Sequence, residues 1–98
     1  MTIEKTENGS ELSVAVTGRI DTVTAPELEA SLKESLDGIT DLTLDFAEVD
    51  YISSAGLRVL LSTQKTMNKQ GAMKVTHVSE LISEIFDVTG FSAILTIE

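Results

Sequence analysis

The fold of this chain is decided by residues 42–58, which read LTLDFAEVDYISSAGLR. Leu42, Leu44 and Phe46 occupy alternate positions, which is the period of a β-strand with two distinct faces. Apolar residues then recur at the spacing of one helical stripe, and these are Leu57, Leu60, Leu61 and Met67. The stretch therefore predicts a buried strand, a connection, and the beginning of a helix.

Two adjacent serines, Ser53 and Ser54, lie where this helix is predicted to begin. Serine is favoured at a helix N-terminus because its hydroxyl can accept a hydrogen bond from a free backbone N–H group. The same end carries the positive pole of the helix dipole, so a phosphate added there would find unpaired donors. On cap preferences alone, both serines are explained as capping residues, and a phosphate acceptor is the alternative.

Two strands are predicted before this stretch. Residues 2–7 are highly charged, which suits the edge of a sheet because charges discourage pairing with other chains. Asn8-Gly9 predicts a hairpin turn, since both residue types tolerate a positive φ. The returning strand is predicted to end at Gly18, and its apolar positions are Leu12, Val14 and Val16.

A linker over residues 19–23 leads to the first predicted helix. Thr24 and Glu27 have the spacing of a capping box, in which each side chain would bond the backbone of the other residue. Asp21 is the notable polar residue of the linker. Two interpretations stay open for it: a turn carboxylate that accepts from nearby N–H groups, or a functional group. The apolar stripe of the helix is Ala25, Leu28, Leu32 and Leu36.

The central helix is predicted to begin at Ser54 or Ala55, to run to about Lys69, and to expose Arg58, Ser62, Lys65 and Lys69. Residues 73–77 alternate as a fourth strand that ends near His77, and residues 93–97 are predicted to form a last strand. Between these two strands, Ser79 is expected to cap a third helix, whose apolar stripe is Leu81, Ile82, Ile85 and Phe86.

The predicted order ββαβαβαβ indicates an α/β fold: one domain over residues 1–98, with a mixed sheet, parallel crossovers and about three helices. Right-handed crossovers would place the ends of the second and third strands side by side. Asp21 and Ser54 would then meet at one edge of the sheet. Open α/β sheets usually carry their binding sites at that edge.

Composition excludes several functional classes. The chain of 98 residues has no cysteine and one histidine, which excludes disulfides, thiolate chemistry and a His-rich metal site. Seven Lys and Arg against sixteen Asp and Glu give a formal net charge of −9, which argues against bulk electrostatic binding to nucleic acid or an anionic membrane. With no signal-peptide pattern and no apolar run of ~20 residues, we expect a cytoplasmic monomer without a metal or other cofactor.

Three motifs resemble one known family. Residues 51–57 (YISSAGL) resemble the signature of the STAS domain, the fold of anti-sigma factor antagonists. Residues 18–21 (GRID) followed by Ala25 resemble the family's turn into its first helix, and residues 88–91 (VTGF) resemble its segment before the last strand. Together the three motifs extend the resemblance over nearly the whole chain.

The resemblance implies a function in a partner-switching pathway. Aligned on Gly56 and Leu57, the serine that a kinase phosphorylates in the family is Ser54, and Ser53 stands where the family usually has Asp. The unphosphorylated protein would bind an anti-sigma factor that is also a serine kinase, and so release a sigma factor. Phosphorylation by that kinase would inactivate the protein, and a PP2C-type phosphatase would remove the phosphate and make it active again. The expected partner-binding residues are Asp21, Ser53, Ser54, Ala55, Gly56 and Arg58.

Two other functions deserve comparison. An enzyme that used Ser54 as a nucleophile would need a base to activate the hydroxyl, but the sequence has a single histidine, no Gly-x-Ser-x-Gly elbow and no Walker-type loop. We therefore expect no catalytic residues. A STAS-type interaction scaffold in another signalling pathway, whose serine is never modified, remains open because the hydroxyl is compatible with both functions.

Overall fold

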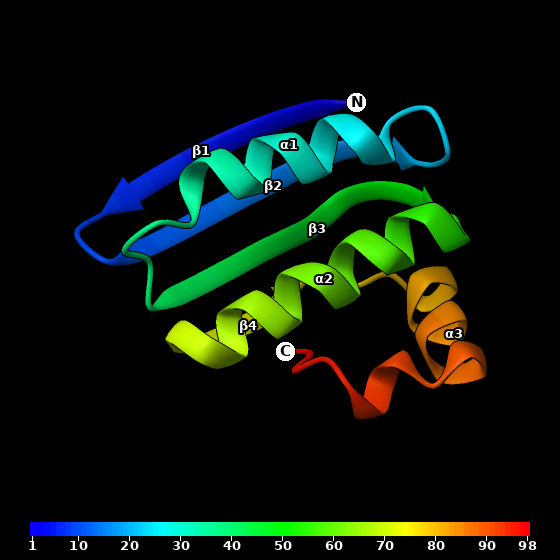
Figure 1. Cartoon of the computed structure of the whole chain (residues 1–98). Helices are drawn as coiled ribbons and strands as arrows, with labels where there is room; N and C mark the ends of the chain where they lie inside the picture. Colours follow the sequence, from blue (N-terminus) through cyan, green and yellow to red (C-terminus); the bar gives the residue numbers. More distant parts are fainter.

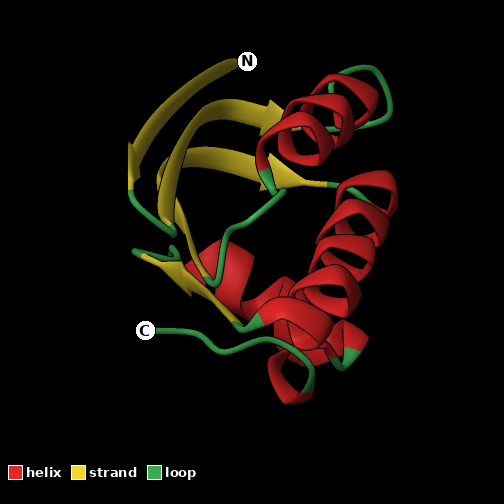
Figure 2. Ribbon diagram, turned by 60° about the vertical axis from the view of Figure 1, so that its left-hand side comes forward, coloured by secondary structure: helices red, strands yellow, loops and turns green.

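Helices α1 and α2 lie across one face of a four-stranded β-sheet in the computed structural model, which describes residues 1–98 (Figures 1 and 2). Figure 2 shows the strands on the left, with α1 and α2 on their right-hand side. The strands are β1 (Thr2–Asn8), β2 (Glu11–Ile20), β3 (Asp41–Ile52) and β4 (Ala72–Thr76). The helices are α1 (Ala25–Ser35), α2 (Ser54–Gln70), α3 (Glu80–Thr89) and the short 3₁₀ helix η1 (Phe91–Ala93).

The spatial order of the strands is the same as their order in the sequence, β1-β2-β3-β4. The hairpin of β1 and β2 is antiparallel, whereas β2, β3 and β4 are parallel to one another. The charged strand β1 lies at the edge, and β3 is paired on both sides. The prediction of an α/β domain with a mixed sheet and parallel crossovers is therefore confirmed.

One apolar core of 23 buried residues lies between the sheet and the helices. Its strand residues include the predicted alternating positions and also Ile20, Val49 and Ile52. The stripes of α1 and α2 complete it, except for Leu61 of α2, which is only half-buried. The largest fully buried side chains include Phe46, Leu44, Leu60 and Phe86. Burying one such side chain is worth about 1.5–3 kcal/mol, so this core is the main source of stability.

Two of the predicted strand ends are wrong, because β2 and β3 both continue to the edge of the sheet. Gly18 does not end β2, and residues 47–50 are part of β3 instead of a loop. The pairing register shifts between Ala15 and Thr17 and again between Gly18 and Arg19. Such bulges bend a strand without ending it, and Gly18 supports the second one with a φ of 101°. The glycine and the charged residues therefore mark irregularities within the strands.

The hairpin loop and the last strand also differ from the prediction. Asn8 still pairs with Glu11, so the hairpin loop is Gly9-Ser10, one residue later than expected. The predicted last strand over residues 93–97 is reduced to a single bridge between Ile97 and Val75. Residues 91–93 instead continue from α3 as a 3₁₀ turn, which leaves too few residues for a strand.

The predicted bounds of α2 and the Ser79 cap of α3 are confirmed. No helix of the chain combines the length and the apolar character that crossing a lipid bilayer requires.

Candidate functional site

The chain leaves the sheet twice at the edge where β2 and β3 end. Ile20 pairs with Ile52 at the end of this parallel pair, and the backbone N–H of Ser53 donates to the carbonyl oxygen of Ile20 at 2.8 Å. Asp21 and Ser53, the first residues after the two strands, therefore leave the sheet from neighbouring positions, as the crossovers predicted. We call this edge the rim.

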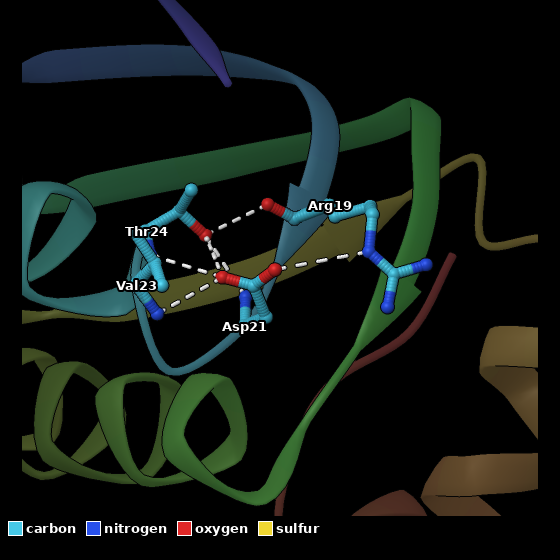
Figure 3. Close-up of polar contacts among 4 residues, drawn as sticks. All are labelled: Arg19, Asp21, Val23 and Thr24. Carbon is cyan, nitrogen blue, oxygen red and sulfur yellow. Dashed lines mark hydrogen bonds and ion pairs between the residues drawn. The ribbon is translucent and has the colours of Figure 1, made fainter.

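A turn around Asp21 forms the beginning of α1 (Figure 3). The Oδ1 atom of Asp21 accepts from the backbone N–H groups of Val23 at 3.0 Å and Thr24 at 3.1 Å. The carbonyl oxygen of Asp21 accepts from the N–H of Ala25 at 2.8 Å. Asp21 thus satisfies N–H groups that an N-cap residue would otherwise serve, which confirms the turn-carboxylate interpretation and leaves its functional role a prediction.

Thr24 turns its hydroxyl back into the same loop. Its Oγ1 accepts from the N–H of Asp21 at 2.9 Å and donates to the carbonyl oxygen of Arg19 at 2.8 Å (Figure 3). Thr24 itself has helical backbone angles and makes no side-chain cap bond to α1. The predicted capping box of Thr24 and Glu27 is therefore wrong, because the hydroxyl is already committed to the turn.

The carboxylate of Asp21 is ionised at neutral pH. The N–H of Thr24 is the main cause that lowers the pKa of Asp21; the N–H of Val23, the Thr24 hydroxyl and Arg19 act in the same direction, and burial opposes them. The Nε atom of Arg19 lies 3.7 Å from the second carboxylate oxygen, Oδ2. Since the Asp21 side chain is 32% exposed, this negative charge faces solvent at the rim.

Two features of the rim escaped the sequence analysis. The Arg19 guanidinium lies 4.7 Å above the ring centroid of Tyr51, a cation–π contact between residues that pair across β2 and β3. This pairing could not be foreseen once β2 was predicted to end at Gly18. The second feature is the exposed apolar side chain of Val23, which is 84% exposed. The linker that contains Val23 has no apolar periodicity, so the sequence carried no signal for this exposure.

The beginning of α2 is built differently from that of α1. Ser53 occupies the N-cap position in an extended conformation, but its side chain makes no cap bond. Its Oγ atom is buried and has no hydrogen-bond partner. Ser54, the first residue of α2, is exposed, and the first α2 side chain that forms a hydrogen bond is Thr63. The two adjacent hydroxyls therefore differ: one lies inside the protein and the other faces solvent.

Gly56 allows α2 to lie directly on the ends of β2 and β3. A Cβ atom at this position would be 2.7 Å from Cγ2 of Ile20 and 2.7 Å from Cγ1 of Ile52. These approaches are too close for any side chain, so the absence of a side chain at Gly56 allows this close packing. Gly56 is buried and offers little surface to a partner, so its predicted contact with one stays a prediction; its effect on the rim is to position Ser54.

A shallow groove of about 260 Å³ separates the first turns of α1 and α2. Thr22, Pro26 and Glu29 line it on one side, and Ala55 and Arg58 line it on the other. Arg58 is exposed and forms no ion pair. The rim thus offers an exposed hydroxyl, a carboxylate, a guanidinium and a groove. His77 is outside the rim: it directly follows β4, beside the middle of β3, where its Nδ1 is 3.1 Å from Oδ1 of Asp45.

Comparison with known proteins identifies the family. Residues 2–98 match the family model described as the STAS domain. The chain belongs to the STAS family. This STAS chain is 32% identical to the anti-sigma-B factor antagonist of Bacillus subtilis over 96 residues, which cover 97% of the chain and 88% of that protein. It is 31% identical to the anti-sigma-B factor antagonist of Staphylococcus aureus, over 97% of the chain and 90% of that protein.

Solved structures agree with this assignment. An anti-sigma factor antagonist from Mycobacterium paratuberculosis superimposes with a TM-score of 0.88 at 26% identity, over 98% of this chain and 83% of that one. SpoIIAA in its unphosphorylated form gives a TM-score of 0.85 at 12% identity, over 99% of this chain and 88% of that one. At so low an identity, the likeness to SpoIIAA concerns the fold alone.

Proposed function

We propose that this STAS protein is an anti-sigma factor antagonist that is switched by phosphorylation of Ser54. In its unphosphorylated form it binds an anti-sigma factor that is also a serine kinase, and thereby frees a sigma factor. Relatives of this name match nearly the full length of the chain at 31–32% identity, which supports the proposal. The roles of individual residues rest on the geometry of the rim.

The observation that carries the choice of Ser54 is the difference between the two adjacent serines. A kinase must reach the hydroxyl that it modifies. The Ser53 Oγ atom is buried, whereas Ser54 is exposed at the first position of α2. The first N–H groups of a helix and its dipole favour a phosphate at this position, so the modified protein can keep its fold.

The consequence of phosphorylation is electrostatic and local. A phosphate adds about −1.5 to −2 charges at pH 7, and this charge would have to be desolvated beneath a bound partner. A loss of only about 1.4 kcal/mol weakens binding tenfold, so no change of fold is needed. A PP2C-type phosphatase would remove the phosphate and restore binding.

The residues of the rim divide into two roles in this proposal. Ser54, Ala55, Arg58 and Asp21 form the surface that the partner covers. Ser53 and Gly56 are positioning residues: the backbone N–H of Ser53 bonds the carbonyl oxygen of Ile20, and Gly56 lies against the ends of β2 and β3. The protein acts by binding, so we expect no enzymatic activity of its own.

Phosphorylation with purified components tests this function. Wild-type protein, Ser54→Ala and Ser53→Ala are each incubated with ATP and the kinase-type anti-sigma factors of the host. We expect one phosphate on wild type and on Ser53→Ala, mapped to Ser54 by peptide mass spectrometry, and none on Ser54→Ala. A phosphate on Ser53 would contradict the assignment. Tight binding without any phosphorylation would favour an interaction scaffold that is never modified.

A further inference from the structure

The cations of this chain fall into two groups. Four of the seven Lys and Arg side chains lie within 4.0 Å of a carboxylate, and these are Lys5, Arg19, Lys33 and Lys74. The other cations form no ion pair, and all of them belong to α2: Arg58, Lys65 and Lys69. Among the Lys and Arg side chains, those without an ion pair are thus confined to one helix.

The charge of α2 is opposite to that of the whole protein. The chain has sixteen carboxylates and a net charge of −9, yet residues 51–79 contain neither Asp nor Glu. No carboxylate of another element pairs with the α2 cations either; Glu29 lines the same groove as Arg58 but pairs with Lys33 at 3.7 Å. In so acidic a protein, the cations of α2 therefore create a local field of the opposite sign.

These cations lie in one row that begins at the proposed phosphorylation site. The row consists of Ser54, Arg58, Ser62, Lys65 and Lys69, all of which are exposed. At 100° per residue, their positions span an arc of only about 80° around the helix axis, and the row is about 22 Å long. Figure 1 shows α2 in front of the sheet, so its outer side is open along its length. We call Arg58, Lys65 and Lys69 the cationic row.

We propose that the cationic row is a docking surface for an acidic segment of the anti-sigma factor that the protein binds. This inference rests on the proposed function and names the chemistry of the partner surface. Charge complementarity carries it: an acidic segment is attracted along α2 and repelled by the other, acidic surfaces of the protein. Such an arrangement fixes the orientation of a complex and accelerates its formation.

The position of Ser54 in the row gives the switch its direction. Ser54 and Arg58 are four residues apart, and side chains at this spacing are neighbours on a helix. A phosphate on Ser54 places about −1.5 to −2 charges at the head of the row and can pair with Arg58. Arg58 would then no longer be free to attract an acidic partner segment, and the phosphate would repel that segment.

A pair of charge-matched double variants tests this inference. Lys65→Glu/Lys69→Glu reverses two cations of the row. Lys33→Glu/Lys74→Glu makes the same change in net charge at cations outside it, on α1 and β4. The probe is the purified host anti-sigma factor that binds the wild-type protein most tightly, titrated calorimetrically. We expect the row variant to bind at least tenfold more weakly, and the control variant to stay within about threefold of wild type. The defect should shrink at high salt, because the Debye length shortens.

Each other outcome overturns the inference in a distinguishable way. Equal losses for both variants would mean that only net charge matters. Unchanged affinity of the row variant would remove α2 from the interface while the proposed function stands. If no host anti-sigma factor binds wild type, the proposed function and the inference both fail. A row-dependent binding to phosphatidylglycerol vesicles, with unchanged affinity for the anti-sigma factor, would assign the row to a lipid surface. Melting temperatures of all variants exclude unfolding as the cause.

Discussion

The first turns of α1 and α2 begin at the same rim, yet they are held by different interactions. At α1, the side chains of Asp21 and Thr24 bond the backbone of their own loop and leave little hydrogen-bonding capacity unused. At α2, neither serine side chain holds the backbone: the Ser53 hydroxyl has no partner and Ser54 faces solvent. The beginning of α2 is held instead by the packing of Gly56 on the ends of two strands and by the backbone bond from Ser53 to Ile20.

This difference separates structure from switching. A side chain that holds its own loop cannot be modified without a loss of stability. A hydroxyl that holds nothing can accept a phosphate while the fold persists. The beginning of α1 is therefore suited to be a constant part of the partner surface, and the beginning of α2 is suited to be the variable part.

The largest expected effect comes from the contact that fixes α2. Gly56→Leu must displace Ile20 and Ile52, since even a Cβ atom would be 2.7 Å from each of these side chains. We expect the free energy of unfolding to fall by about 3 kcal/mol. Ser62→Leu places the same side chain on the exposed side of the same helix, and should change it by less than about 0.5 kcal/mol. Urea unfolding measures both. Equal stabilities would show that α2 does not depend on this packing.

A smaller effect is expected at the beginning of α1. Asp21→Ala removes the acceptor of two backbone N–H groups, so we expect a fall in the free energy of unfolding that is clear but smaller than that of Gly56→Leu. Asp21→Asn keeps an oxygen in the same place and should cost less than half as much. The Asn variant therefore separates the effect of the Asp21 charge from that of its hydrogen bonds. Under the proposed function it should still fold but bind the kinase more weakly. Normal binding by Asp21→Asn would make Asp21 a turn residue and nothing more.

The smallest effect compares two serines at the same helical position. Ser79 caps α3, because its Oγ accepts from the N–H of Ile82 at 3.2 Å. Ser79→Ala should lower the free energy of unfolding by about 1 kcal/mol. Ser53 is the N-cap of α2 but makes no such bond, so Ser53→Ala should cost nothing measurable. A loss at Ser53 as large as that at Ser79 would show that its hydroxyl does cap α2 in solution.

The sequence predicted the elements of this fold well, because the period of the apolar residues reflects the core directly. The apolar positions of β2 and β3, the stripe of α1 and most of the stripe of α2 are buried as expected, whereas Leu61 of α2 is half-buried and Leu81 of the predicted α3 stripe is exposed. Where the strands end could not be predicted, since the pairing of Arg19 with Tyr51 depends on bulges that only the neighbouring strand reveals. The last strand, predicted over residues 93–97, is only a single bridge at Ile97 for the same reason: the residues of a strand do not encode its pairing partners.

The candidate site was predicted in part. The motif over residues 51–57 indicated Ser54, and the crossover rule brought Asp21 to the same rim. The burial of the Ser53 hydroxyl could not be foreseen, because two adjacent serines look alike in sequence and differ only once β3 and α2 are in place. Likewise, Thr24 and Glu27 have the spacing of a capping box, but tertiary hydrogen bonds take the hydroxyl elsewhere.

The central claim is that Ser54 controls binding without supporting the fold. Calorimetric titration of the kinase-type anti-sigma factor into wild type, Ser54→Ala and Ser54→Asp, with thermal melts of the three proteins, tests it directly. We predict equal affinity for wild type and Ser54→Ala, and a severalfold weaker affinity for Ser54→Asp, whose single charge only partly imitates a phosphate. The melting temperatures should agree, because Asp is tolerated in the first turn of a helix. Equal affinities for all three proteins would contradict the claim, and so would a weaker affinity accompanied by a large fall in melting temperature.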